Sequence, residues 1–123
     1  MNPRGTSSSP SLLAADAGAT VRRLSRCVGD GELDSPAEMY RVLGALRLLA
    51  DDLTHFLPAL QDRLEDRLLS GQVVRHSGGE PLEATWDAVG EVGRALAHAR
   101  TVALLMTKEL ENSQVALRDL ATP

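Results

Sequence analysis

The stretch of this sequence with the clearest chemical potential is DDLTHFLP, residues 51–58. Asp51 and Asp52 precede His55 by four and three residues, a spacing that brings the three side chains together on a helix. A carboxylate beside an imidazole is typical of acid–base pairs and of metal sites. When Leu53 is taken as the centre of the apolar stripe, however, Asp51 and His55 point away from the core. We therefore predict a solvated helix face with no catalytic or metal role, and a contact with a partner as the alternative.

Two other histidines and one cysteine are the remaining candidates. His98 falls on the outer face of a predicted helix among charged side chains, which indicates solvated surface. His76 lies in a predicted turn, where binding residues are common, so a role for it stays open. Cys27 is the single cysteine and excludes an intrachain disulfide. Its place beside an apolar stripe predicts a buried or half-buried thiol, with an intermolecular disulfide as the alternative.

A basic cluster, Arg22, Arg23 and Arg26, offers a possible anion contact with phosphate or an acidic partner. The net charge of −4 argues against a protein whose affinity comes from neutralising phosphates. We expect no nucleic-acid partner. A small regulatory or mobile-element accessory protein that contacts nucleic acid through these arginines is the alternative hypothesis.

The sequence has no phosphate-binding glycine loop, no zinc-ligand spacing and no inward-facing carboxylate pair. We therefore predict no enzymatic activity, no catalytic or metal-ligating residues and no cofactor. Trp86, at the edge of an apolar stripe, is better explained by packing in a core or an interface than by ligand stacking.

Length and composition set the fold class. The chain of 123 residues suffices for one domain, and 43% of it is apolar but only 2% aromatic, which favours an all-α fold. No apolar run approaches the ~18–20 residues of a membrane span, and the N-terminus lacks a secretory pattern. We expect a cytoplasmic protein without a membrane partner, with residues 1–10 as a disordered tail and residues 11–123 as a single helical domain.

The first predicted helix spans residues 12–28. Ser11 is the expected cap, and Gly29 and Gly31 end the helix. Its apolar residues recur at spacings of four and three and form one stripe: Leu13, Ala17, Val21, Leu24 and Val28.

The second predicted helix spans residues 36–70. It opens with the capping box SPAE, from Ser35, and ends at Gly71 as a left-handed cap. Pro58 interrupts the helix and predicts a kink, with the ring facing solvent. The apolar stripe is regular: Met39, Val42, Leu46, Leu49, Leu53, Phe56 and Leu60. It is widened on one side by Leu43, Ala50, Leu57 and Leu64.

The third predicted helix spans residues 81–119, after a turn at 71–80 with a possible extended piece at Val73 and Val74. Its apolar residues repeat every seven positions, which implies a left-handed supercoil against a partner helix. The first heptad position holds Leu82, Val89, Leu96, Ala103, Leu110 and Leu117, and the second holds Val92, Ala99, Met106 and Leu120.

The two long helices have similar lengths and a short connection, which predicts an antiparallel hairpin with the short helix beside it. Residues 102–106, VALLM, are apolar around the whole helix and need neighbours on every side. We therefore predict that two hairpins associate into a four-helix bundle. The expected interface residues are Trp86, Val102, Leu104, Leu105 and Met106.

Two stretches, DSPAEMYRVLGALRLLADDL at 34–53 and the GGEP turn with the helix that ends ELENSQVALRDL, resemble small uncharacterised actinobacterial helical-hairpin proteins. The resemblance implies the same helical architecture and assigns no activity. WXG100-type secreted hairpins are similar in size, but here the tryptophan lies inside a helix and the tyrosine-bearing tail signal is missing. The leading hypothesis is a non-enzymatic helical protein that self-associates or binds a partner helix by heptad packing, and a WXG100-like secreted hairpin is a further alternative.

Overall fold

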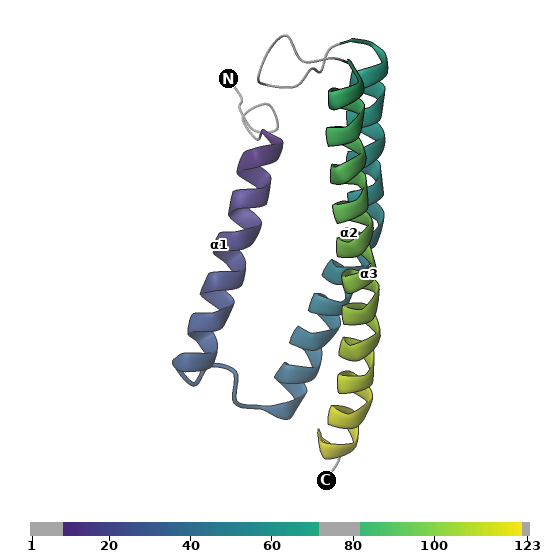
Figure 1. Cartoon of the computed structure of the whole chain (residues 1–123). Coiled ribbons are helices and arrows are strands. Elements are labelled where there is room, and N and C mark those ends of the chain that lie inside the picture. Colours follow the sequence, from purple (N-terminus) through teal and green to yellow (C-terminus); the bar gives the residue numbers. More distant parts are fainter. Residues whose placement is uncertain (1–8, 72–81, 122–123) are drawn as a thin grey trace. The chain divides into compact units, whose positions relative to one another are not determined.

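The computed structural model describes residues 9–71 and 82–121. These residues form three helices and no strand: α1 Pro10–Gly29, α2 Pro36–Leu69 and α3 Leu82–Ala121 (Figure 1). The all-α fold is confirmed. Most of the predicted N-terminal tail, the turn with His76, the extended piece at Val73 and Val74, and the start of a third helix at Pro81 lie outside the described residues.

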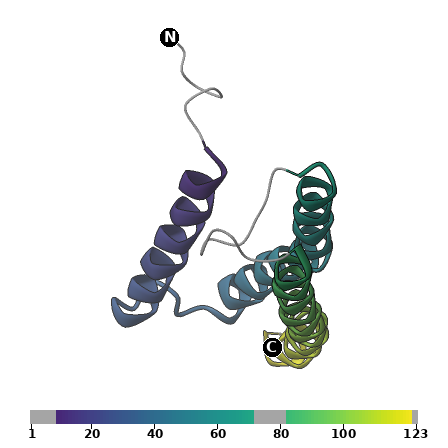
Figure 2. The ribbon, with the colours of Figure 1, turned by 45° about the horizontal axis from the view of Figure 1, so that its top comes forward.

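The helices belong to two units, which we describe separately: one runs to Met39 and the other begins at Tyr40. Within the second unit, α2 and α3 pack against each other as a helical hairpin, and Figure 2 shows them side by side. No helix in the described ranges carries an apolar run sufficient to cross a bilayer.

The N-terminus of α1 differs from the sequence prediction. Ser9 is the cap, because its Oγ accepts from the N–H of Leu12 at 3.3 Å and Pro10 occupies the first helical position. The prediction that Ser11 caps this helix is therefore wrong. Proline at the first position costs no hydrogen bond, so the helix begins two residues earlier than residue 12.

The C-terminus of α1 is closed by Gly31, as predicted. Its φ of 76° is in the left-handed region that glycine adopts without strain. The N–H of Glu32 donates to the carbonyl of Cys27 at 2.9 Å, and the N–H of Gly31 donates to that of Val28 at 3.3 Å. This pair of bonds is a Schellman motif, which satisfies carbonyls that the last turn leaves open.

The boundaries of α2 confirm the sequence prediction. The N–H of Glu38 donates to Ser35 Oγ at 2.9 Å, so Ser35 is the cap. At the other end, Gly71 has a φ of 77° and its N–H donates to the carbonyl of Leu68 at 3.0 Å. Between them α2 is continuous through Pro58. Figures 1 and 2 show that α2 bends along its length, as a proline inside a helix predicts.

The face of α2 that packs on α3 is rotated from the predicted stripe. Ala50 and Thr54 are 1% and 3% exposed, whereas Leu53, the predicted centre, is 38% exposed. On α3, Val89 and Ala103 are buried, which places the first heptad position in the seam.

From Val92 onwards the second heptad position of α3 is outside the seam, because Val92 and Met106 are 41% and 47% exposed, whereas Thr85, one repeat earlier, is 3% exposed. The seam instead uses the positions one residue later, and these hold small or polar side chains. They are Gly93, Arg100, Thr107 and Gln114. Small and polar side chains therefore share the seam with leucines, and several large apolar side chains stay exposed beside it.

Hydrogen bonds across the seam fix its register. Arg100 Nε donates to the carbonyl of Thr54 at 3.1 Å, and Gln114 Nε2 donates to the carbonyl of Tyr40 at 3.1 Å. The acceptors are 14 residues apart on α2 and the donors 14 residues apart on α3, in opposite directions. The helices are therefore antiparallel in a single register, with Ala50 and Ala103 at nearly the same level.

Candidate functional site: the two sides of the hairpin

The DDLTHFLP stretch is part of the solvated surface of α2. Asp51, Asp52 and His55 are exposed, and His55 Nδ1 donates to the carbonyl of Asp51, at 2.9 Å, and not to a carboxylate. Thr54, in the same stretch, is buried in the seam. Among the described residues, no three His, Cys, Asp or Glu side chains gather as metal ligands would.

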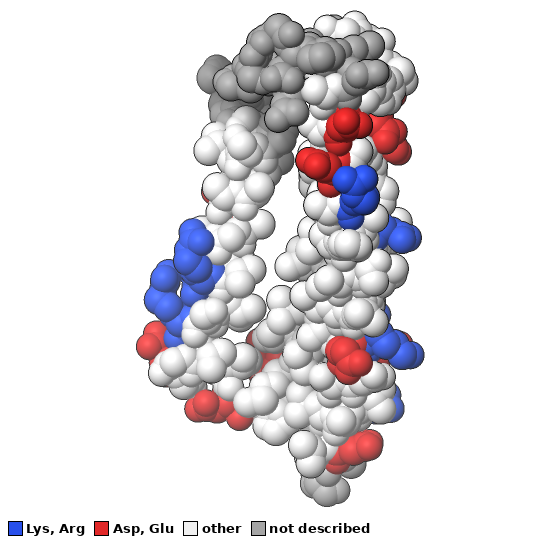
Figure 3. All heavy atoms as spheres, viewed as in Figure 1, with Lys and Arg blue, Asp and Glu red and all other residues white. Residues whose placement is uncertain are grey.

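The candidates outside this stretch are also dispersed. His98 is exposed on α3, and Cys27 is half-buried on α1. The Glu32 side chain, which hydrogen-bonds to the thiol, raises the pKa of Cys27, and desolvation raises it further. Arg22, Arg23 and Arg26 are exposed, and Figure 3 shows basic side chains gathered on α1.

Pro58 was predicted to face solvent, and this prediction is wrong. The proline is half-buried and lines a cavity against α3. Because proline has no N–H, the carbonyl of Thr54 loses its partner within α2. Arg100 supplies the missing donor from α3, through the Nε bond described above. This arginine therefore satisfies the acceptor that the proline leaves open.

A second polar contact lies in the other half of the seam. The amide of Gln114 accepts from Arg47 Nε at 3.1 Å while it donates to the carbonyl of Tyr40. A Cβ on Gly44 would lie 2.8 Å from Gln114 Nε2, so the glycine makes room for this amide. Gln114 is 8% exposed, and these bonds satisfy a buried polar group.

The seam residues of α2 recur in α3, 53 positions later. The α2 set is Leu43, Arg47, Ala50, Thr54, Leu57, Gln61 and Leu64, and the α3 set is Leu96, Arg100, Ala103, Thr107, Leu110, Gln114 and Leu117. All seven residue types match, so the hairpin has an approximate internal twofold relation. This repeat is visible in the sequence, and sequence reasoning missed it because the larger leucines dominated the apolar pattern.

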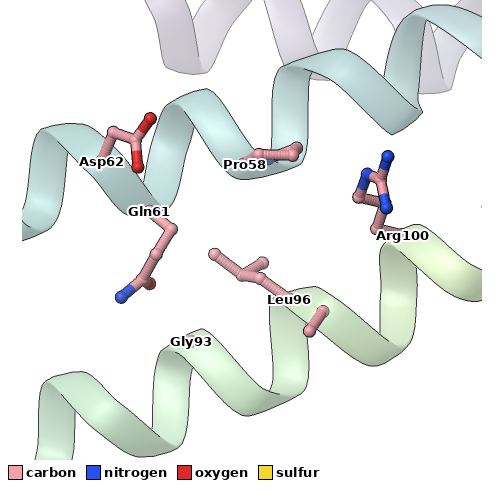
Figure 4. A pocket seen from close by; sticks show the side chains of 7 residues that line it. Pro58, Gln61, Asp62, Gly93, Leu96 and Arg100 are labelled. Carbon is pink, nitrogen blue, oxygen red and sulfur yellow. The ribbon is translucent and has the colours of Figure 1, made fainter.

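The repeat is broken around Pro58, where the cavity lies (Figure 4). Arg47 binds the amide oxygen of Gln114, but its counterpart Arg100 binds Thr54, and the buried Oε1 of Gln61 is left without a hydrogen-bond partner. At about 180 Å³ the cavity is smaller than the 300–1,000 Å³ typical of ligand pockets. It is lined by Pro58, Gln61, Asp62, Gly93, Leu96, Ala97 and Arg100.

The other side of the hairpin is a band of large apolar side chains, which we call the apolar side. Its members are between 38% and 57% exposed: Leu49, Leu53, Phe56 and Leu60 of α2, with Val92, Val102 and Met106 of α3. At 100° per residue these side chains lie on one flank of the seam, away from Pro58. A groove between Leu60, Leu64 and Val92 runs along this band.

The predicted interface residues divide between faces of α3. Val102 and Met106 belong to the apolar side. Trp86 and Leu104, at 44% and 43% exposure, lie on the flank of Pro58, and Leu105, at 61%, faces outward. A single apolar surface therefore includes only two of the five residues.

Comparisons with protein-family models, with curated proteins and with solved structures found no match to this chain.

Proposed function

We propose that this chain is a non-enzymatic helical interaction protein that associates with further helices, from a second copy or a partner, through the apolar side. The observation that carries the proposal is that many large apolar side chains of α2 and α3 lie on the surface and not in the contact between the two helices. Among the described residues, the buried apolar side chains are Ala50, Leu68, Val89 and Ala103, while seven large apolar residues form an exposed band. Contiguous exposed apolar surface of this kind marks sites of protein association.

The energies support association. Full burial of a Leu, Val, Phe or Met side chain is worth about 1.5–3 kcal/mol, so covering a half-exposed one contributes about 1 kcal/mol. Seven such residues on each of two hairpins give about 14 kcal/mol, which is close to the upper end of the association cost of about 4–15 kcal/mol.

The conspicuous polar residues of the hairpin have structural roles, which supports a non-catalytic protein. Arg47, Gln114 and Arg100 form hydrogen bonds across the seam. We further propose a cytoplasmic location, since a single cysteine suits a reducing compartment.

A matched pair of variants tests the function. Leu53→Glu places a charge on the apolar side, and Leu48→Glu places one at a 58%-exposed position on another face of α2. The readouts are mass by light scattering and the fluorescence of a dye that binds apolar surface. We expect the unmodified chain to form a complex larger than 13.2 kDa or, as a monomer, to bind the dye. Leu53→Glu removes either property and Leu48→Glu preserves it.

Circular dichroism of both variants confirms that the helices persist. A monomer that binds no dye would contradict the proposal, because its apolar side would then be covered within the chain. Equal effects of Leu53→Glu and Leu48→Glu would contradict it as well.

A further inference from the structure

We propose that the occupant of the apolar side is a second copy of this chain, oriented with both hairpin turns at the same end, so that α2 of each copy packs against α3 of the other. This arrangement rests on the proposed function and specifies its partner. It is one of two that a twofold axis in the interface allows. In the other, the turns lie at opposite ends and α2 packs on α2.

Charge along the edges of the apolar side favours the first arrangement. Arg63 lines the groove on this side, at the outer edge of α2, and Glu91 lies at the outer edge of α3. The register that joins Thr54 to Arg100 places these two residues at one level, each nine positions along its helix towards the turn. With the turns together, Arg63 of one copy meets Glu91 of the second copy.

In the opposite orientation the axis that superimposes the two bands passes near Leu53. Asp52, beside Leu53, points outward as Leu105 does on α3, so its charge does not decide between the two orientations. Charge complementarity of the type between Arg63 and Glu91 selects orientation at helical interfaces.

Side-chain size favours the same arrangement. Phe56 of α2 is at the level of His98, and the nearest residues of α3 on the apolar side are Ala95 and Ala99. A large ring on one helix against two alanines on the other fits the knobs-into-holes packing of antiparallel bundles. With α2 against α2, Phe56 would instead meet leucines at a level already filled by large side chains.

Cysteine cross-linking distinguishes the two orientations. Each variant carries Cys27→Ser, so that the introduced thiol is the only one. Leu60→Cys and Ala95→Cys are at one level of α2 and α3, so chains of the two types, co-expressed and oxidised, report the same-end dimer. Leu46→Cys and Leu60→Cys lie equally far on either side of Leu53 and report the opposite-end dimer.

We expect a covalent dimer from Leu60→Cys with Ala95→Cys, and none from Leu46→Cys with Leu60→Cys. The reverse result overturns the orientation, and so does a dimer that neither pair cross-links. A chain that is monomeric at all concentrations overturns the choice of a second copy. The dye experiment above tests the proposed function separately. A monomer that loses dye binding in Leu53→Glu still has an exposed apolar side on which another protein can bind.

A charge exchange gives an independent readout. The proposed dimer has two contacts between Arg63 of one copy and Glu91 of the other. Arg63→Glu or Glu91→Arg alone gives both contacts like charges, so we expect the dissociation constant to rise about three- to tenfold. The double variant restores opposite charges between the copies, and its dissociation constant returns towards that of the unmodified chain. Additive weakening in the double variant contradicts the same-end arrangement.

Discussion

At the scale of single residues, a hydrogen bond between α2 and α3 replaces one that Pro58 removes from α2. Pro58 leaves the carbonyl of Thr54 without a helical partner, and Arg100 donates to it from α3. In the internal repeat, Arg100 and Gln61 correspond to Arg47 and Gln114, which are hydrogen-bonded to each other. Because Arg100 donates to Thr54 instead, the amide oxygen of Gln61 has no hydrogen-bond partner.

We predict that Arg100→Ala lowers the free energy of unfolding by about 1–2 kcal/mol, because a part-buried carbonyl loses its donor. In a Pro58→Ala background the N–H of residue 58 can donate to the carbonyl of Thr54. Arg100→Ala should then lower the free energy of unfolding by less than about 0.5 kcal/mol. Urea unfolding of the four chains measures the coupling, with Arg94→Ala, an exposed arginine of α3, as the control. Equal costs in both backgrounds would refute the role of Arg100.

The second residue-scale prediction concerns Cys27. Its pKa is raised by the Glu32 side chain and by desolvation, so the thiol stays protonated to higher pH than a free cysteine. Thiolate is the form that reacts with alkylating agents. We expect Glu32→Gln to lower the pKa and to increase the rate of alkylation by iodoacetamide severalfold at neutral pH. A rate–pH profile that is the same in both chains would contradict this assignment.

At the scale of elements, the sequence predicts the helices well and their contact faces poorly. Ser35 and Gly71 are strong local signals, and α2 lies where they place it. The predicted stripe was widened on the correct side, by Leu43, Ala50, Leu57 and Leu64, but its centre was misplaced because the apolar periodicity follows large side chains, whereas close helix packing selects small ones. Ala50 and Thr54 lie beside the leucine stripe, and no hydropathy pattern distinguishes a buried threonine from a solvated one.

The internal repeat identifies the true seam. It pairs Arg47, Thr54 and Gln61 with Arg100, Thr107 and Gln114, and polar residues recur at matched spacing only where their positions are constrained. The candidate site was partly predictable: residues 102–106 were expected to need partners, and four of the five are exposed. The division of those residues between faces depends on the seam rotation, which required the structure.

Two glycines test how closely the helices approach. Gly44→Ala would place a Cβ 2.8 Å from the amide of Gln114 and displace it from Tyr40 and Arg47. Gly90 has no neighbouring atom within 4 Å at its Cβ position, so Gly90→Ala should stabilise α3 by about 1 kcal/mol through helix propensity alone. We expect Gly44→Ala to be less stable than Gly90→Ala by about 1–2 kcal/mol in thermal unfolding. Similar stabilisation by both changes would show that the Gln114 contact contributes little.

At the scale of the whole molecule, many large apolar side chains of the hairpin are exposed and few are fully buried. Its buried apolar residues are Ala50, Leu68, Val89 and Ala103, and two of these are alanines. Such a seam fixes register through hydrogen bonds, and its leucines are half-buried, so each contributes only part of the free energy of full burial. If a second copy covers the apolar side, as we propose, this contact buries further apolar area, and association and stability are then linked.

The most direct test of this linkage is the urea midpoint of unfolding, measured over a hundredfold range of chain concentration. If the apolar side is buried between two copies, mass action stabilises the folded state and the midpoint rises steadily with concentration. Leu53→Glu should abolish that dependence and Leu48→Glu should retain it. A midpoint that is independent of concentration in the unmodified chain would contradict the account.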